Sequence, residues 1–202
     1  MRRPPRGLTD SLRIIGGRFR GRRLGFPPLP GLRPTPDRVR QTLFDWLAPH
    51  ITGARCLDLF AGSGALGLEA LSRGAATVTF VEREPEAADA IRAHLATLGA
   101  SGGEVVSSDA LGAFAALGGP FDVVFVDPPF ESSYRKRALD LLAGSAALAA
   151  EARVYLEGPA DEAPTAPEGW VLHRSKRAGN VGYHLFVVAG ASGVTRAPAP
   201  PS

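Results

Sequence analysis

The sequence predicts an α/β fold built on a mostly parallel, doubly wound sheet. From residue 54 onward, short apolar runs alternate with stretches of helical character, and this alternation is typical of parallel strands joined by crossover helices. The first of these units has a glycine-rich turn between its strand and its helix. The last two apolar runs are separated by too few residues for a crossover helix, so they predict an antiparallel hairpin on the sheet edge.

The N-terminal segments have a different composition. Residues 1–11 are rich in Pro and Arg, and we expect a disordered basic tail. Residues 12–24 hold two short apolar islands among glycines and arginines, which predicts a small strand or hairpin that displays arginines. Residues 25–34 are rich in Pro and Gly and predict a loop.

A helix is predicted to begin near residue 36. Thr35 is its expected N-cap, Pro36 its first helical residue, and Asp37 places a negative charge in the first turn. Arg38 and Arg40 are expected to lie off its apolar face. That face comprises Val39, Leu43, Trp46 and Leu47.

The remaining elements follow from the apolar runs and the stretches between them. The parallel strands are expected at 55–60, 77–81, 104–106, 121–126 and 153–156, the helices near 65–73, 85–98, 110–117 and 133–148, and the hairpin strands at 170–174 and 183–188. We therefore expect a domain over 49–188, preceded by a basic hairpin and helix at 12–48 and followed by a disordered Ala- and Pro-rich tail at 189–202.

Composition excludes several classes of protein. The chain has 202 residues, enough to bury a core without disulfides or metals. Its single cysteine, Cys56, excludes an intrachain disulfide framework and favours a reducing, cytoplasmic setting. No apolar run reaches the roughly 18 residues that a membrane span needs. We therefore expect no membrane contact. The four histidines lack metal-ligand spacing, so we expect no metal.

The net charge of +3 conceals a strong asymmetry. Residues 1–40 contain eleven arginines against two aspartates, a net charge of +9. Residues 41–202 contain twelve Lys and Arg against eighteen Asp and Glu, a net charge of −6. A basic arm on an acidic body favours a polyanionic partner such as nucleic acid. The alternative is a solubilising tail.

The glycine-rich turn fits two kinds of cofactor. Gly62, Gly64 and Gly67 form a G-x-G-x-x-G pattern, and Glu82 lies twenty residues after the first glycine, as in NAD-binding folds. Asp58, however, precedes the turn, and a carboxylate there would repel a pyrophosphate. The same carboxylate would attract the α-ammonium group of S-adenosylmethionine, which has no phosphates. This favours S-adenosylmethionine.

Two more acidic residues follow successive strands at the same crevice. Glu82 is expected to accept both ribose hydroxyls, and Asp109 to accept from the adenine amine. Alternatively, Glu82 is a solvated strand end and Asp109 a helix N-cap. The full set expected at the cofactor is Asp58, Phe60, Ala61, Gly62, Ser63, Gly64, Glu82, Arg83, Asp109 and Ala110.

The sequence DPPF follows the fourth strand, and we expect its residues to hold a target amine. Asp127 and the carbonyl of Pro128 can both accept from one NH₂ group, which frees the nitrogen lone pair for attack. Pro129 stiffens the loop, and Phe130 can stack on an extruded base. The alternative is a rigid turn capped by Asp127. Cytosine C5-methylation is excluded, because that reaction needs a cysteine nucleophile and the single cysteine, Cys56, lies in a different strand.

Together these segments resemble the RsmD-type methyltransferases, which methylate the N2 amine of a guanine in 16S ribosomal RNA. The matching segments are RIIGGRFRGRRL at 13–24, GLRPTPDRVRQTLFDWL at 31–47, CLDLFAGSGALGLEALSRGA at 56–75, VFVDPPF at 124–130 and, more weakly, HRSKRAGNVGYHLF at 173–186. The resemblance covers residues 12–188. It implies a Rossmann-like class I S-adenosylmethionine-dependent methyltransferase that acts on 16S rRNA or the small subunit. We expect a monomer.

The resemblance also gives the arginines a role. The segment Arg33–Arg40 would cover the cofactor and target pocket, and the basic hairpin would contact rRNA phosphates, which orients the enzyme without reading sequence. The expected RNA contacts are Arg13, Arg18, Arg20, Arg22, Arg23, Arg33, Arg38 and Arg40. A DNA adenine N6-methyltransferase, an NAD-dependent oxidoreductase and a non-catalytic RNA-binding assembly factor are the alternatives.

Overall fold

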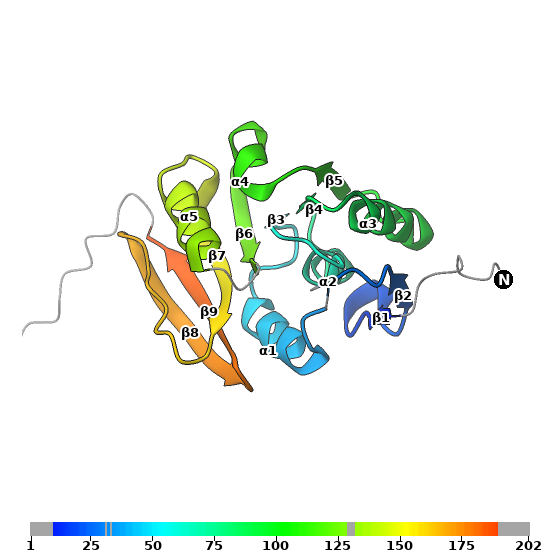
Figure 1. Cartoon of the computed structure of the whole chain (residues 1–202), viewed down its shortest axis with the longest axis horizontal. Helices are drawn as coiled ribbons and strands as arrows, with labels where there is room; N and C mark the ends of the chain where they lie inside the picture. Colours follow the sequence, from blue (N-terminus) through cyan, green and yellow to red (C-terminus); the bar gives the residue numbers. More distant parts are fainter. Residues whose placement is uncertain (1–9, 31, 33, 129–131, 190–202) are drawn as a thin grey trace, which may run out of the picture.

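The computed structural model describes residues 10–189 except 31, 33 and 129–131 (Figure 1). A seven-stranded sheet forms its centre, with strand order β5-β4-β3-β6-β7-β9-β8. The strands are β3 (Arg55–Asp58), β4 (Thr77–Glu82), β5 (Gly103–Ser107), β6 (Phe121–Val126), β7 (Leu148–Pro159), β8 (Trp170–Ala178) and β9 (Val181–Val188). The first five pair in parallel, and β9 pairs antiparallel with both β7 and β8. The predicted doubly wound sheet and its antiparallel hairpin are confirmed.

Helices cover both faces of the sheet because strand residues alternate between two cores. Cys56 and Phe125 pack on the side of α1 (Asp37–Leu47), α2 (Ala65–Ser72) and α3 (Pro85–Leu98). Leu57 and Val124 pack on the side of α4 (Ala110–Ala113), a 3₁₀ turn (Phe114–Ala116) and α5 (Ser132–Ala143). In parallel strands the carboxyl ends share one edge, so Asp58, Glu82 and Asp127 end up together.

The N-terminal hairpin is part of the folded body. Strands β1 (Asp10–Arg13) and β2 (Arg23–Phe26) pair antiparallel and enclose a 3₁₀ turn, η1 (Gly17–Phe19). The apolar side chains of the hairpin, Leu12, Ile14, Leu24 and Phe26, are buried in the same core as α1 and α2. The strand starts at Asp10, within the segment expected to be a tail. The expectations of disorder at both ends otherwise fall on residues outside the described part of the chain.

Helix α1 starts differently from the prediction. Its N-cap is Pro36, not Thr35, and no side chain caps it. Thr35 is buried and its carbonyl accepts from Arg40 Nε at 3.1 Å. Arg40 itself is fully buried, so the expectation that it lies off the packed face was wrong. Periodicity missed this because it classes every arginine as polar, whereas this one has partners inside the protein.

The region after α5 was also predicted incorrectly. The helix was expected to reach residue 148, but it ends at Ala143, and β7 runs from Leu148 instead of from 153. The alanine-rich sequence favours helix by propensity. Pairing of Leu148 with Phe121 of β6 overrides that preference, and a register irregularity between Phe121 and Val123 accommodates the residues before Arg153.

Candidate active site

The glycine-rich turn joins β3 to α2 and depends on backbone conformations that favour glycine. Gly62 has φ +53° and Gly64, the N-cap of α2, has φ +75°. Gly67 is in the helix, where a Cβ would lie 2.2 Å from a ring carbon of Phe80. The first two glycines therefore shape the turn, and the third lets α2 pack closely on β4.

Asp58 ends β3 and lies beneath this turn. It is buried, and its Oδ2 accepts the Gly67 backbone N–H at 2.9 Å. Burial raises the pKa of Asp58 to about 7, the Gly67 hydrogen bond opposes this shift, and the charge on Glu82 adds to it. A carboxyl group with this pKa changes its ionisation readily when a charged ligand arrives.

Glu82 ends β4 and is buried, so it is not a solvated strand end. Its Oε2 accepts the N–H of Gly62 at 2.7 Å and its Oε1 accepts the N–H of Glu84 at 2.8 Å. Asp109 is exposed and caps α4, with Oδ2 accepting the Gly112 N–H at 3.0 Å. The capping interpretation of Asp109 is therefore confirmed, and its role at a cofactor stays a prediction.

Asp127 follows β6, and the parallel register of Val126 with Leu156 places it beside Glu157 of β7. The pKa of Asp127 is well above its ordinary range because of burial, then the charge on Glu157, then that on Asp58. Two neighbouring carboxyl groups in a desolvated site disfavour each other's ionisation, so this pair holds protons more tightly than free carboxylates.

Glu157 is a site residue that sequence reasoning missed. It is buried, and its Oε1 accepts the Tyr155 hydroxyl at 2.7 Å. Burial raises its pKa, while hydrogen bonds from Tyr155 and Thr35 oppose that rise. A signal was present, because Glu157 directly follows the apolar run 153–156 just as Asp127 follows 121–126.

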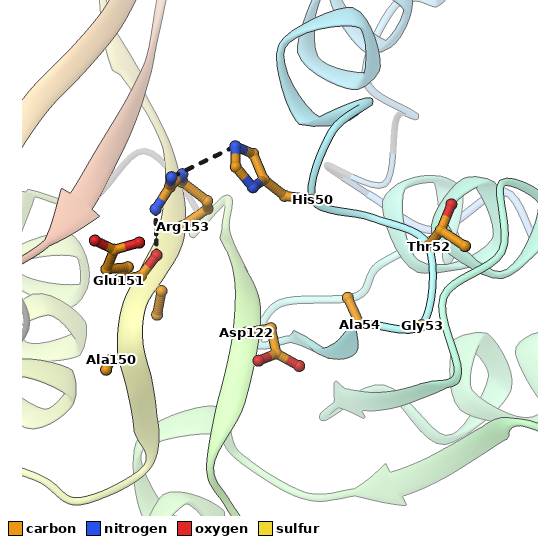
Figure 2. A pocket seen from close by; sticks show the side chains of 9 residues that line it. His50, Thr52, Gly53, Ala54, Asp122, Ala150, Glu151 and Arg153 are labelled. Carbon is orange, nitrogen blue, oxygen red and sulfur yellow. Dashed lines mark hydrogen bonds between the residues drawn. The ribbon is translucent and has the colours of Figure 1, made fainter.

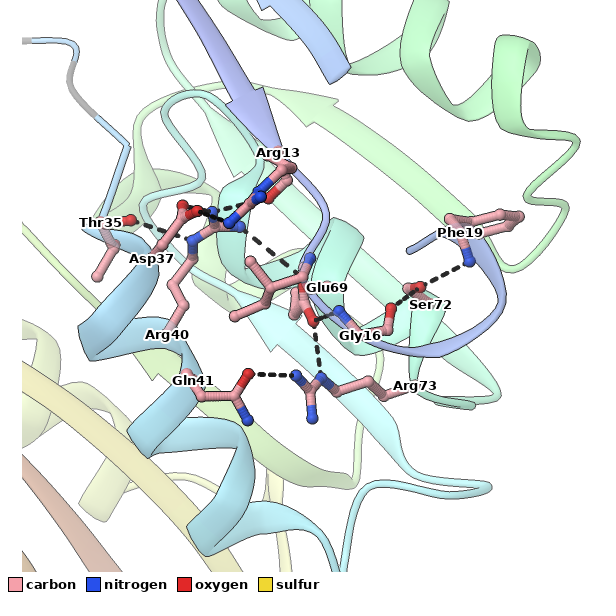
Figure 3. Close-up of polar contacts among 12 residues, drawn as sticks. Arg13, Gly16, Phe19, Thr35, Asp37, Arg40, Gln41, Glu69, Ser72 and Arg73 are labelled. Carbon is pink, nitrogen blue, oxygen red and sulfur yellow. Dashed lines mark hydrogen bonds and ion pairs between the residues drawn. The ribbon is translucent and has the colours of Figure 1, made fainter. Parts of the chain in front are cut away.

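A second buried carboxylate cluster centres on Glu69 of α2 (Figure 3). Glu69 accepts the backbone N–H groups of Ile15 and Gly16 at 2.9 and 2.8 Å, and Arg73 Nε at 2.7 Å. Arg40 lies 3.8 Å from the same carboxylate. This cluster fastens the loop of the N-terminal hairpin to α2.

The glycines of the RIIGG segment allow that close approach. Gly17 has φ +70°, and a Cβ there would lie 1.8 Å from the Ser72 carbonyl oxygen. The Ser72 hydroxyl donates to the Gly16 carbonyl at 2.5 Å and accepts the Phe19 N–H at 3.0 Å. This segment therefore has a structural role that the sequence analysis did not predict.

Comparison with known proteins identifies the family. The family model described as Conserved hypothetical protein 95 matches residues 12–187. A curated relative from Escherichia coli K12, Ribosomal RNA small subunit methyltransferase D, is 49% identical over 187 residues, covering 92% of this chain and 94% of the relative. The chain belongs to the RsmD-type methyltransferase family.

Other relatives and solved structures agree with this family assignment. The Haemophilus influenzae protein of the same name is 43% identical and covers 87% of this chain and 93% of its own length. The solved structure of Escherichia coli yhhF superposes with a TM-score of 0.84 at 49% identity, covering 90% of this chain and 99% of that one. That of Thermus thermophilus TrmN gives 0.61 at 27% identity, covering 75% and 48%. The predicted class I S-adenosylmethionine-dependent methyltransferase fold is confirmed.

The other residues expected in this RsmD-type site are placed as follows. Ala61 donates its N–H to the Val81 carbonyl at 2.9 Å, and Phe60 meets the Tyr134 ring edge-on at 6.5 Å between centroids. Ser63 and Ala110 are buried, whereas Arg83 is exposed and pairs with Glu84. Pro128 is half-buried. Pro129, Phe130 and Arg33 lie outside the described residues.

Most of the arginines expected to contact RNA are at the surface. Arg13 pairs with Asp37 at 3.1 Å, and the Arg18 guanidinium lies 4.3 Å from the centre of the Phe19 ring. Arg40 is different, because it donates to the carbonyls of Thr35 and Arg13 and to Asp37. The expectation that Arg40 contacts RNA was therefore wrong. The exposed members are Arg13, Arg18, Arg20, Arg22, Arg23 and Arg38.

Two pockets are lined by residues other than Asp58, Glu82 and Asp127. One, of about 330 Å³, opens at the opposite edge of the sheet between His50, Asp122 and Arg153 (Figure 2). The other, of about 680 Å³, lies between α5 and residues 158–167. Among the described residues, no group of three or more His, Cys, Asp or Glu could hold a metal, and no helix could cross a membrane.

Proposed function

We propose that this RsmD-type protein transfers a methyl group from S-adenosylmethionine to the exocyclic N2 amine of a guanine in 16S rRNA. The observation that carries the proposal is the position of Asp58 and Asp127. Both are desolvated carboxyl groups at the carboxyl ends of adjacent strands, and neither forms an ion pair within the described residues. Such groups suit a cationic cofactor and an amine donor.

The carboxyl groups at this end of the sheet suit S-adenosylmethionine by charge. Asp58 would accept from the α-ammonium group, which removes the penalty of keeping an ionised carboxylate buried. Glu82 would accept from the ribose hydroxyls, and the free lone pairs of Asp109 from the adenine amine. Gly62 keeps the turn compact, since a Cβ there would lie 3.2 Å from the Leu32 side chain.

Asp127 and the Pro128 carbonyl would hold the two hydrogens of the guanine N2 amine. When bound, S-adenosylmethionine supplies an electrophilic methyl group. Accepting both hydrogens directs the nitrogen lone pair at that methyl, so the chain contributes mainly alignment and exclusion of water. The N–C bond would form as the S–C bond breaks, and Asp127 would accept the proton that the nitrogen loses. Phe130 would stack on the base.

The family and the charge distribution support an rRNA substrate. Curated relatives are named for methylation of small-subunit ribosomal RNA, and the exposed arginines of the hairpin would contact phosphates. These contacts give affinity that depends on salt and not on sequence. No metal is required by this chemistry, and a monomer in the cytoplasm is the expected setting.

The test uses small subunits purified from cells that lack this methylation. Labelled S-adenosylmethionine is added with wild-type protein or with Asp127→Ala, and the RNA is digested to nucleosides. We expect label in N2-methylguanosine with the wild type alone. When DNA is supplied in place of the subunits, label in N6-methyladenine would instead indicate an adenine methyltransferase. In calorimetry, binding of NAD without S-adenosylmethionine would indicate an oxidoreductase.

A further inference from the structure

The outer strand β8 presents an unusual surface. It is the last strand of the sheet, so one side of its backbone has no partner strand within the described residues. Every residue from Val171 to Arg177 is exposed, including Val171 at 62% and Leu172 at 44%. Within this stretch lie three basic residues, Arg174, Lys176 and Arg177.

The register with β9 assigns these side chains to faces. Arg174 is opposite Leu185 and Lys176 is opposite Tyr183, and residues directly opposite in an antiparallel pair share a face. Tyr183 stacks on Trp46 at 5.5 Å, so that face is the one covered by α1. Arg177 projects to the α5 face.

The basic residues Arg174, Lys176 and Arg177 extend to the end of the sheet that carries the site's carboxyl groups. Lys176 pairs with Tyr183, which in turn pairs with Glu157, so only β9 separates the lysine from the carboxylates. At the other end, Arg153 lies 3.4 Å from His50 (Figure 2). Burial lowers the pKa of His50, and the charges of Arg153 and His173 lower it further. The opposing charge at that end is Glu151.

The charges on β8 are not used inside the protein. Arg174, Lys176 and Arg177 form no ion pair with any described residue. A second copy of the chain is a poor partner, because edge-to-edge pairing of two β8 strands would bring these cations together. A polyanion is complementary to them.

We propose that β8 and its turn into β9 form a second RNA-binding surface, which contacts rRNA phosphates flanking the target nucleotide. The inference rests on the proposed function and extends it. Figure 1 shows the N-terminal hairpin in blue and β8 in orange on opposite sides of the molecule. The two basic surfaces would therefore hold the RNA on both sides of the carboxylate crevice, whose own charge repels phosphates.

The experiment compares Arg174→Ala combined with Lys176→Ala against two controls. Arg174→Lys with Lys176→Arg keeps the charges, and Arg92→Ala removes an exposed arginine from α3, far along the sheet. Affinity for naked 16S rRNA and for undermethylated small subunits is measured between 50 and 200 mM salt. Loss of two phosphate contacts should reduce the slope of log affinity against log salt by about 1.5 and weaken binding about tenfold.

The controls should keep the wild-type slope, and the affinity of the alanine variant for S-adenosylmethionine should not change. An unchanged salt slope in the alanine variant overturns the proposal. If that variant also self-associates, the charges only prevent two β8 edges from pairing with each other. If the wild type methylates rRNA and the slope is unchanged, this surface alone fails. If the slope falls but no rRNA is methylated, the surface stands and the proposed function fails.

Discussion

Two kinds of desolvated carboxyl group, in α2 and at the ends of neighbouring strands, differ in their partners. Glu69, within the helix, has two backbone N–H donors and the guanidinium groups of Arg73 and Arg40. Asp58, beneath the start of the helix, has one backbone donor, and Asp127 is next to another acid. Both sets are desolvated, but only the first is neutralised by cations of the described chain.

This difference separates structure from function. A buried carboxylate that is paired within the chain holds elements together. Removing it destabilises the fold, because its cationic partners are left buried and unpaired. A buried carboxyl group without a cationic partner has a raised pKa, and the binding of a cationic ligand stabilises its ionised form. The first set fastens the hairpin to the sheet domain, whereas the second is suited to a cationic cofactor and an amine.

Glu69→Ala should have the largest effect on stability. It leaves Arg73 without its carboxylate, leaves the buried Arg40 with Asp37 alone, and removes the acceptor of two backbone N–H groups. We therefore expect a loss of about 3–5 kcal/mol in the free energy of unfolding. Denaturant titration measures this loss. Glu104→Ala, at an exposed position of β5, is the control, and an equal effect of the two substitutions would show that Glu69 has no special structural role.

Asp127→Ala should leave the fold intact and remove activity. We expect kcat to fall about 10²- to 10³-fold, as when a group that stabilises the transition state is deleted, with little change in affinity for S-adenosylmethionine. Single-turnover methylation and calorimetry measure the two quantities. Asp127→Asn keeps one acceptor oxygen and should be less damaging. A near-normal rate in the alanine variant would contradict the assigned role.

The hairpin arginines should have a smaller effect, confined to RNA. Arg20, Arg22 and Arg23 replaced by Ala should weaken RNA binding by about tenfold at physiological salt and flatten its salt dependence, since each lost phosphate contact reduces the slope by about 0.7–0.9. Filter binding across a salt series measures this. A slope equal to that of the wild type would show that these side chains are only solvated.

The sequence was sufficient for the alternating elements and for the acids at strand ends, because both follow from local periodicity and from the shared carboxyl edge of parallel strands. It could not show that Arg40 is buried or that Thr35 turns toward Glu157, since these depend on long-range packing. Glu157 could have been predicted by the same rule as Asp127, because both directly follow an apolar strand. The docking of Gly17 on Ser72 required the three-dimensional structure.

The raised pKa of Asp58 also predicts how stability depends on pH. The folded protein holds this proton up to about pH 7, whereas the unfolded chain releases it near the ordinary value of 3.8. The contribution of Asp58 to the free energy of unfolding should therefore fall as pH rises from about 4 to 7. Asp58→Asn should flatten that decline in urea titrations of the protein without cofactor, and a parallel decline in the variant would assign it to other groups.

Proton release on cofactor binding tests the central claim most directly. With a pKa of about 7, Asp58 is half protonated at pH 7, and an ammonium group beside it should expel about half a proton. Calorimetry of S-adenosylmethionine binding in buffers of different ionisation enthalpy measures this number. We predict that the wild type releases about half a proton. Asp58→Asn should lose both this release and affinity for S-adenosylmethionine. Equal release by both proteins, or none by the wild type, would contradict the account.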